Sequence, residues 1–158
     1  MHKVYSEDTP RGAVRLIGRY RASVYGPDGV LRETREGLNV VTTVGKEFLA
    51  SYLYSGAAAA STFTCKYAAV GTSTTPEAAA DTALGTELVR TTGTVSYVSG
   101  AIFQVTATFT TGVAAGQVTE YGLFSSSTGG TLFSRDTEST ITVGASDTLV
   151  VVYQCAFS

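Results

Sequence analysis

The sequence is poor in the residues that most enzyme active sites use. It contains one histidine, His2, and no tryptophan. A Ser/His/Asp or Cys/His mechanism needs a histidine that is held firmly in place, and a lone histidine near the start of an irregular segment does not meet that need. The phosphate-binding P-loop, the dinucleotide-binding GxGxxG and the zinc-protease HExxH motifs are absent as well. We therefore expect no enzymatic activity and no cofactor.

Cysteines and paired carboxylates are equally scarce. Cys65 and Cys155 lie far apart and show no CxxC or Cys/His spacing, so we expect no metal site. We interpret them as buried thiols that pack as small apolar groups, with a disulfide as the alternative. Asp136 and Glu138 form the most obvious carboxylate pair, but a glycosidase also needs aromatic platforms. We interpret this pair as a polar loop between strands and expect no small-molecule substrate.

Charge and hydropathy exclude two further classes of partner. Charged residues make up 15% of the chain and the net charge is −2, which argues against a general nucleic-acid binder. No apolar run approaches the roughly 20 residues of a membrane helix. Residues 1–10 are too polar for the core of a secretory signal. We expect a soluble protein with neither a nucleic acid nor a membrane as partner.

The sequence is rich in period-two alternation, most clearly at its end. One parity of the last segment is large and apolar, namely Leu149, Val151, Tyr153, Cys155 and Phe157. β-branched and aromatic residues suit a central strand. Residues 117–158 hold four β segments separated by short turns, which leaves no room for crossover helices and predicts antiparallel pairing. We predict an all-β fold, an antiparallel β-sandwich of jelly-roll-like or Ig-like type, with about eight to nine strands and one short helix.

The N-terminal part divides into an arm and a hairpin. Residues 1–12 lack periodicity and hold only Val4 and Tyr5 as large hydrophobes, which predicts an extended arm that becomes ordered against a partner. Residues 13–37 then form a hairpin around the turn Gly26-Pro27-Asp28-Gly29. One face of its first strand carries arginines, and we predict that the arm and this face bind a partner through Val4, Tyr5, Arg11, Arg15, Arg19 and Arg21. The alternative is a solvated face with cross-strand ion pairs. Residues 13–158 form the single predicted domain.

Residues 39–55 are the one credible helix. Thr43 can cap it, and an apolar stripe at helical spacing predicts a face packed in the core. The stripe consists of Val44, Phe48, Leu49, Tyr52 and Leu53.

Glu120 is the most unusual residue of the predicted strands. It stands inside the apolar segment VTEYGLF, where a buried and unpaired carboxylate would be costly. Alternation places it on one face with Val118, Gly122 and Phe124. We predict a structural role for Glu120, in which it pairs with Arg90 or Arg135 and fixes the strand register.

Two motifs carry a resemblance to a known group of proteins. VTEYGLF (Val118–Phe124), followed by a Gly-Gly turn, is the most specific, and AVGT followed later by ALGTEL is the second. In this order, after the predicted helix, they resemble small virion structural proteins of tailed bacteriophages, over residues 39–158. The resemblance implies a particle component, either a capsid decoration (cement) protein or a module of a tail fibre or baseplate.

The resemblance and the arm together predict a function. We expect a decoration protein that is made in the host cytoplasm and binds the capsid surface of the virion, clamping adjacent subunits of the major capsid protein. Its self-association is expected to give a homotrimer at local threefold positions of the shell, where several weak contacts reinforce one another. A tail-fibre or baseplate module is the alternative. A glycan hydrolase is the weakest of the three hypotheses.

Overall fold

The computed structural model describes residues 15–54 and 64–158. The predicted arm, residues 1–12, therefore lies outside the described residues. The described part contains nine strands and one helix, in the order β1 (Leu16–Tyr25), β2 (Leu31–Val41), α1 (Thr43–Tyr54), β3 (Tyr67–Gly71), β4 (Glu87–Thr92), β5 (Thr94–Ser99), β6 (Ile102–Phe109), β7 (Gly116–Phe124), β8 (Leu132–Val143) and β9 (Thr148–Phe157).

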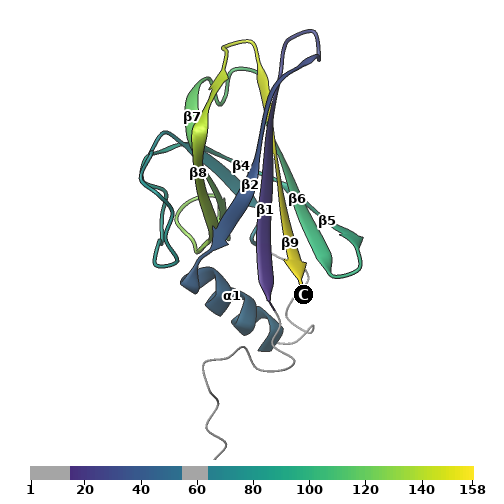
Figure 1. The fold of residues 1–158 in the computed structure, drawn as a ribbon, viewed down its shortest axis with the longest axis vertical. Coiled ribbons are helices and arrows are strands. Elements are labelled where there is room, and N and C mark those ends of the chain that lie inside the picture. Colours follow the sequence, from purple (N-terminus) through teal and green to yellow (C-terminus); the bar gives the residue numbers. More distant parts are fainter. Residues whose placement is uncertain (1–14, 55–63) are drawn as a thin grey trace, which may run out of the picture.

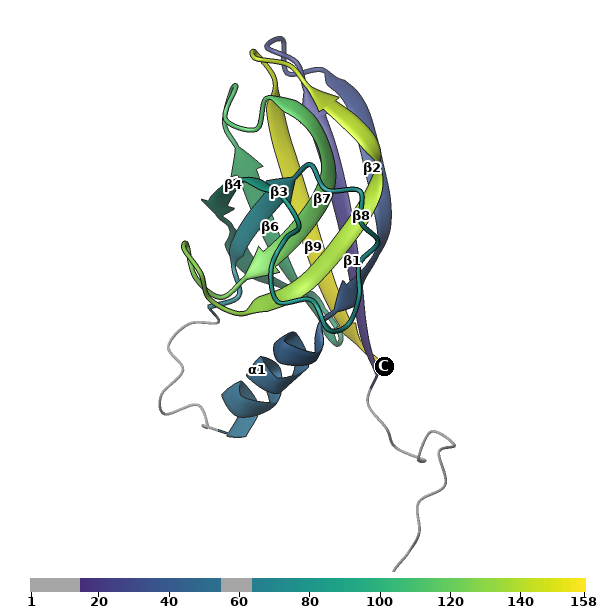
Figure 2. The ribbon, with the colours of Figure 1, turned by 90° about the vertical axis from the view of Figure 1, so that its left-hand side faces the viewer.

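The strands form one antiparallel sheet that curls into a half-barrel (Figures 1 and 2). Their order is β4-β3-β7-β8-β2-β1-β9-β6-β5. Strands account for 57% and helix for 9% of the described residues, which confirms the predicted all-β class and antiparallel pairing. β9 lies between β1 and β6, so the predicted central position of the last strand is confirmed.

Two segments connect the two halves of the curled sheet. One half contains β4, β3, β7 and β8, and the other contains β1, β9, β6 and β5. β2 pairs with β1 from Leu31 to Asn39, but it pairs with β8 only at Val40 and Val41. Residues 87–99 are divided at Gly93 into β4 and β5, which end the sheet on opposite sides. A Cβ at Gly93 would lie 2.7 Å from the Val105 side chain and about as close to two carbonyl oxygens, so the chain turns there without a side chain.

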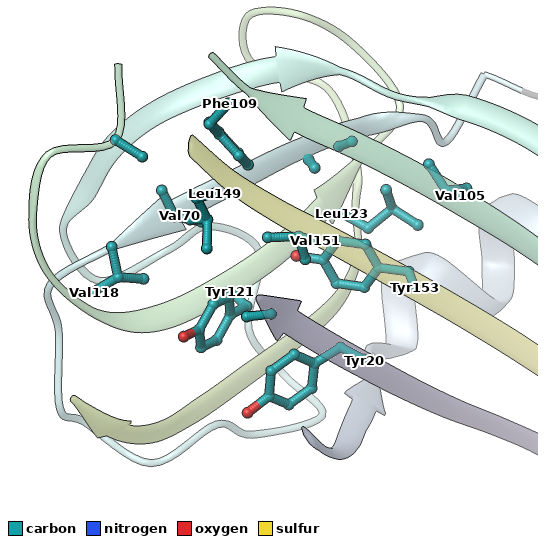
Figure 3. Close-up of a cluster of buried hydrophobic side chains, with 14 of the residues drawn as sticks. Tyr20, Val70, Val105, Phe109, Val118, Tyr121, Leu123, Leu149, Val151 and Tyr153 are labelled. Carbon is teal, nitrogen blue, oxygen red and sulfur yellow. The ribbon is translucent and has the colours of Figure 1, made fainter. Parts of the chain in front are cut away.

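The core fills the inside of the curl. Its large members come from both halves and include Tyr20, Val105, Phe109, Tyr121, Leu123, Leu149 and Tyr153 (Figure 3). Cys65 and Cys155 belong to it as free thiols, which confirms the thiol interpretation over the disulfide. A second, smaller cluster of Ala69, Leu84, Phe124 and Leu132 lies apart from this core.

Helix α1 differs from its prediction in position and packing. Residues 39–41 belong to β2, and the cap is Thr42, whose Oγ1 accepts a hydrogen bond of 3.0 Å from the Gly45 amide. The helix lies below one end of the sheet (Figures 1 and 2), and Gly45 is its only buried residue. Phe48 and Leu49 pack partly against the core, whereas Leu53 is exposed, so a fully buried stripe was the wrong prediction.

Strand β8 corrects a second expectation. The predicted polar loop at residues 136–139 lies in the middle of the continuous strand β8, and Asp136 is buried. Polar residues of this strand meet polar partners: Asp136 lies beside Tyr20 and opposite Tyr121, and the Thr137 amide and hydroxyl donate to Glu77 at 3.2 and 2.6 Å.

Candidate functional site

The exposed face of β1 carries the described part of the predicted binding set. Arg15, Arg19 and Arg21 are exposed, and Tyr20 and Ala22 between and after them are buried in the core. The alternation of β1 therefore places these arginines on the outside of the curled sheet. Val4, Tyr5 and Arg11 lie outside the described residues.

Neighbouring strands place polar side chains beside these arginines. In one row across the sheet, Arg19 lies between Gln154 of β9 and Leu38 of β2. The Gln154 amide donates a 2.9 Å hydrogen bond to Gln104 of β6, which extends the row. In the next row, Arg21 lies between Val152 and Glu36.

These two rows line an open hollow of about 520 Å³ on the outer face of the sheet. Arg21 forms an ion pair of 2.6 Å with Glu36, and both side chains are more than half exposed. Cross-strand ion pairs were the alternative interpretation of this face, and Arg21 fits it. Arg19 forms no ion pair with a described residue. The hollow therefore offers one free guanidinium beside two side-chain amides, a set that suits a carboxylate or a carbonyl-rich surface.

The start of β1 lies at the end of the molecule where the helix is found. The amide of Arg15 donates to the Ser158 carbonyl at 2.7 Å, and the Ser158 amide donates back at 3.0 Å. Figure 2 shows α1 below the same end. Residues 1–14 are therefore joined to the body next to the arginine-bearing face of β1.

Glu120 forms a buried ionic cluster on the other half of the sheet. Its side chain has no exposed area, and its Oε1 accepts from the Arg135 guanidinium, 2.7 Å from Nη2. Arg135, one of the two predicted partners, also contacts Asp81 at 2.7 Å. Burial alone would lower the pKa of Arg135, but hydrogen bonds to Asp81 and Glu120 raise it. The ion pair predicted for Glu120 is thus present.

The cluster attaches a long connection to the sheet. The amides of Gly85 and Thr86 donate to the two Glu120 oxygens at 2.6 and 3.1 Å, and Arg135 donates to the carbonyls of Thr75 and Pro76. The other candidate, Arg90, instead pairs with Glu87 and lies over the Phe124 ring. A register shift between Val118 and Glu120 places Val118 in the main core, so the predicted common face of these two residues is wrong.

A third polar group lies where β2 and β8 separate. Asp136 is 3% exposed, and its Oδ2 has no hydrogen-bond partner among the described residues. The hydroxyls of Tyr20 and Tyr121 are also buried there, that of Tyr20 beside the Asp136 carboxyl, and their rings stack at 4.7 Å (Figure 3). Burial raises the pKa of Asp136 to about 7, and the charges of Glu77 and Glu138 add to the rise, while hydrogen bonding from Tyr20 and the Thr137 amide opposes it. Only a weak signal in the sequence points to this group, namely a carboxylate within a segment of mixed polarity.

Side chains close the gap between the two strands. The Arg35 guanidinium donates to the Thr140 carbonyl and the Ser139 hydroxyl, both at 3.1 Å. It also pairs with Glu33, whose second oxygen accepts from the Thr142 amide. Asp136 and Glu138 lie beside this side-chain seam, since a Cβ at Gly37 of β2 would be 3.3 Å from Asp136 Oδ2 and 3.2 Å from Glu138 Oε1.

The described part of the chain shows neither a metal site nor a membrane helix. Within residues 15–54 and 64–158, no group of three or more His, Cys, Asp or Glu side chains is arranged to hold a metal ion. No helix in this part of the chain is long and apolar enough to cross a membrane. Comparison with protein-family models, curated proteins and solved structures gave no match.

Proposed function

We propose that the protein is a structural component of a bacteriophage virion, and specifically a capsid decoration protein. The carrying observation is the exposed row of arginines on β1, which borders the hollow on the outer face and leads directly into residues 1–14. A partner bound by the arm would meet this face next. The VTEYGLF and ALGTEL motifs support the phage assignment, and a tail-fibre or baseplate module is the alternative placement.

The chemistry of this face fits an acidic or carbonyl-rich protein surface, such as that of a major capsid protein. Arg19 has no ion-pair partner among the described residues, so a carboxylate could bind it without breaking an existing pair. Gln104 and Gln154 can accept and donate hydrogen bonds beside it.

In addition, we propose that the curled sheet is a variant β-sandwich, jelly-roll-like or Ig-like, since β2 and residues 87–99 each pass from one half to the other.

Binding to particles tests the proposal. Shells of the phage that encodes the chain, stripped of this protein, should be decorated by the full chain in many copies. Removing residues 1–12 should weaken the binding and make what remains more sensitive to salt, because exposed charge pairs are screened. Arg19→Glu should weaken binding further.

Arg32→Glu is the matched control. It makes the same charge change on the same hairpin, at an exposed residue that does not line the hollow. Equal decoration by all variants would contradict the proposed contact face. Imaging of labelled protein at one vertex only would instead favour the tail placement.

A further inference from the structure

The two ends of the sheet differ in their protection against further pairing. β4, at one end, carries Glu87 and Arg90, which form an ion pair of 2.7 Å. β5, at the other end, reads TVSYVS and has no charge (Figure 1). Charged residues on an edge strand prevent pairing with another chain, whereas a neutral edge rich in β-branched and aromatic residues permits it. Within residues 15–54 and 64–158, β5 is therefore the end of the sheet that is open to another strand.

The direction of the backbone groups on β5 follows from its neighbours. The Ala101 carbonyl, just before β6, accepts from the Phe157 amide of β9. Since successive residues of a strand point their backbone groups to opposite sides, Gln104 and Thr106 point theirs toward β5.

Ser96 and Thr94 lie opposite Gln104 and Thr106, so these two residues of β5 bond to β6. Val95 and Tyr97 consequently direct their amides and carbonyls away from the sheet. The Gly93 amide agrees with this direction, since it donates to Lys66, on the side away from β6.

The side chains of this edge are only partly covered. Tyr97 is 73% exposed, and Val98 is 45% exposed. Val95, on the inner side, is partly buried and packs against the edge of the core. A strand added at this edge would cover the apolar surface of Val95 and Tyr97 and would satisfy their backbone groups.

We propose that the occupant of this edge is β5 of a second copy, paired antiparallel about a twofold axis at Ser96. In this register Val95 lies opposite Tyr97 of the second copy on the inner side, and Thr94 lies opposite Val98 on the outer side. A twofold interface requires a patch that complements itself. Because β5 has no charged residue, two copies of it can pair without electrostatic repulsion. Pairing β4 with itself would instead bring like charges of Glu87 and Arg90 into one interface. This inference does not depend on the proposed function.

The size of the contact makes the dimer weak. A six-residue strand is about 20 Å long and a sheet layer about 10 Å thick, so the edge presents roughly 200 Å² per copy. Stable complexes bury about 1,200 Å² or more in total. We therefore expect weak association in free solution, and stronger pairing wherever copies are held close together. A twofold pair also differs from the trimer expected from the sequence, and the mass of the complex separates the two.

Disulfide trapping tests the register. Ser96 would face its symmetry mate in a pair without backbone hydrogen bonds, with Cα atoms about 4.5 Å apart, which is within disulfide range. Under mild oxidation at several hundred micromolar, Ser96→Cys should form a covalent dimer. Thr108→Cys is the matched control because Thr108 is exposed on the outer face of β6 and lies beyond the residues that pair with β5. The native cysteines are buried and should not interfere.

Sedimentation equilibrium tests the association without a cross-link. Ser96→Lys would place two ammonium groups opposite each other and should weaken dimerisation at least tenfold, while Thr108→Lys should leave it unchanged. The proposal is overturned if the native chain stays monomeric up to millimolar concentration or forms trimers. Equal cross-linking of the two cysteine variants would also overturn it.

Discussion

At the scale of single residues, two carboxylates on neighbouring strands have opposite surroundings. Glu120 is fully buried but accepts hydrogen bonds from Arg135 and two backbone amides. Asp136 is nearly as buried, but its Oδ2 has no hydrogen-bond partner among the described residues, and the nearby Tyr20 offsets only part of the cost of burying its charge. A buried charge is tolerable when donors surround it and costly when they do not. The first residue therefore supports the fold at neutral pH, and the second one opposes it.

Replacing Glu120 by Gln should destabilise the protein by about 3 kcal/mol, because it leaves Arg135 without its buried counter-charge. The Gln amide would also place a donor among three donors. Urea unfolding at pH 7 measures the loss. Glu36→Gln breaks an exposed ion pair and should change stability by less than about 1 kcal/mol. Similar small losses in both variants would show that the buried cluster contributes little.

The pKa of Asp136 predicts a pH dependence of opposite sign to that of an ordinary paired carboxylate. The folded pKa is about 7, above the unfolded value, so the folded state holds a proton that the unfolded state has lost. Stability should thus fall as pH rises from about 4 to about 7, by on the order of 4 kcal/mol. Asp136→Asn should remove this loss and exceed the native chain in stability at pH 8.

The control for this experiment is Glu47→Gln, at an exposed helix residue. Thermal unfolding followed from pH 4 to pH 8 should show a difference between native and Asp136→Asn that grows with pH, and none for Glu47→Gln. A constant difference for Asp136→Asn would mean that the carboxylate titrates at its ordinary value.

Sequence reasoning identified Glu120 but missed Asp136, for a physical reason. A lone charge in an apolar strand stands out against its neighbours, and only two arginines offered a counter-charge. Asp136 stands among serines, threonines and Glu138, which is the composition of a loop. Only the pairing of Tyr121 with Asp136 across β7 and β8 shows that this position faces inward.

At the scale of elements, alternation and turn residues predicted most strands, and long-range contacts decided the rest. The β1–β2 hairpin and the central β9 follow from local pattern. The division at Gly93 does not, because the residues that require a glycine there, such as Val105, come from distant parts of the chain. Helix α1 was placed too early for a similar reason, since pairing with β8 keeps Val40 and Val41 in a strand. The arginines of β1 were correctly placed on one exposed face, but the hollow beside them depends on the strand order.

Gly45 sets the distance between α1 and the sheet. A Cβ there would lie 2.3 Å from the Phe133 carbonyl oxygen and 2.8 Å from its Cα, so Gly45→Ala must push the helix away from β8. We expect a net loss of about 1–2 kcal/mol in chemical unfolding, despite the higher helix propensity of alanine. Lys46→Ala, at the exposed next position, should be nearly neutral. An increase in stability on Gly45→Ala would show that the helix is not held against β8.

At the scale of the whole molecule, the curled sheet behaves as one unit because its two halves share segments. β2 belongs to both halves, and residues 87–99 supply both terminal strands. The main core cluster draws on β1, β6 and β9 from one half and on β7 and β8 from the other. Unfolding one half would therefore expose the core surface of the other, which favours a single cooperative transition.

The two cysteines allow this cooperativity to be measured in both halves at once. Cys65 precedes β3 in one half and Cys155 lies in β9 of the other, and burial raises the pKa of each thiol to about 12. Neither should react with a thiol reagent in the folded state, because the thiolate is the reactive form and both side chains are inaccessible.

In a urea series with short labelling pulses, mass spectrometry of the two peptides should give the same midpoint for both cysteines. That midpoint should match the one from far-UV circular dichroism. Thr108→Cys, exposed on the outer face, supplies a thiol that labels at every urea concentration and controls for the reagent. If either native cysteine labels at clearly lower urea than the other, the half that contains it unfolds on its own, and the shared segments do not couple the sheet.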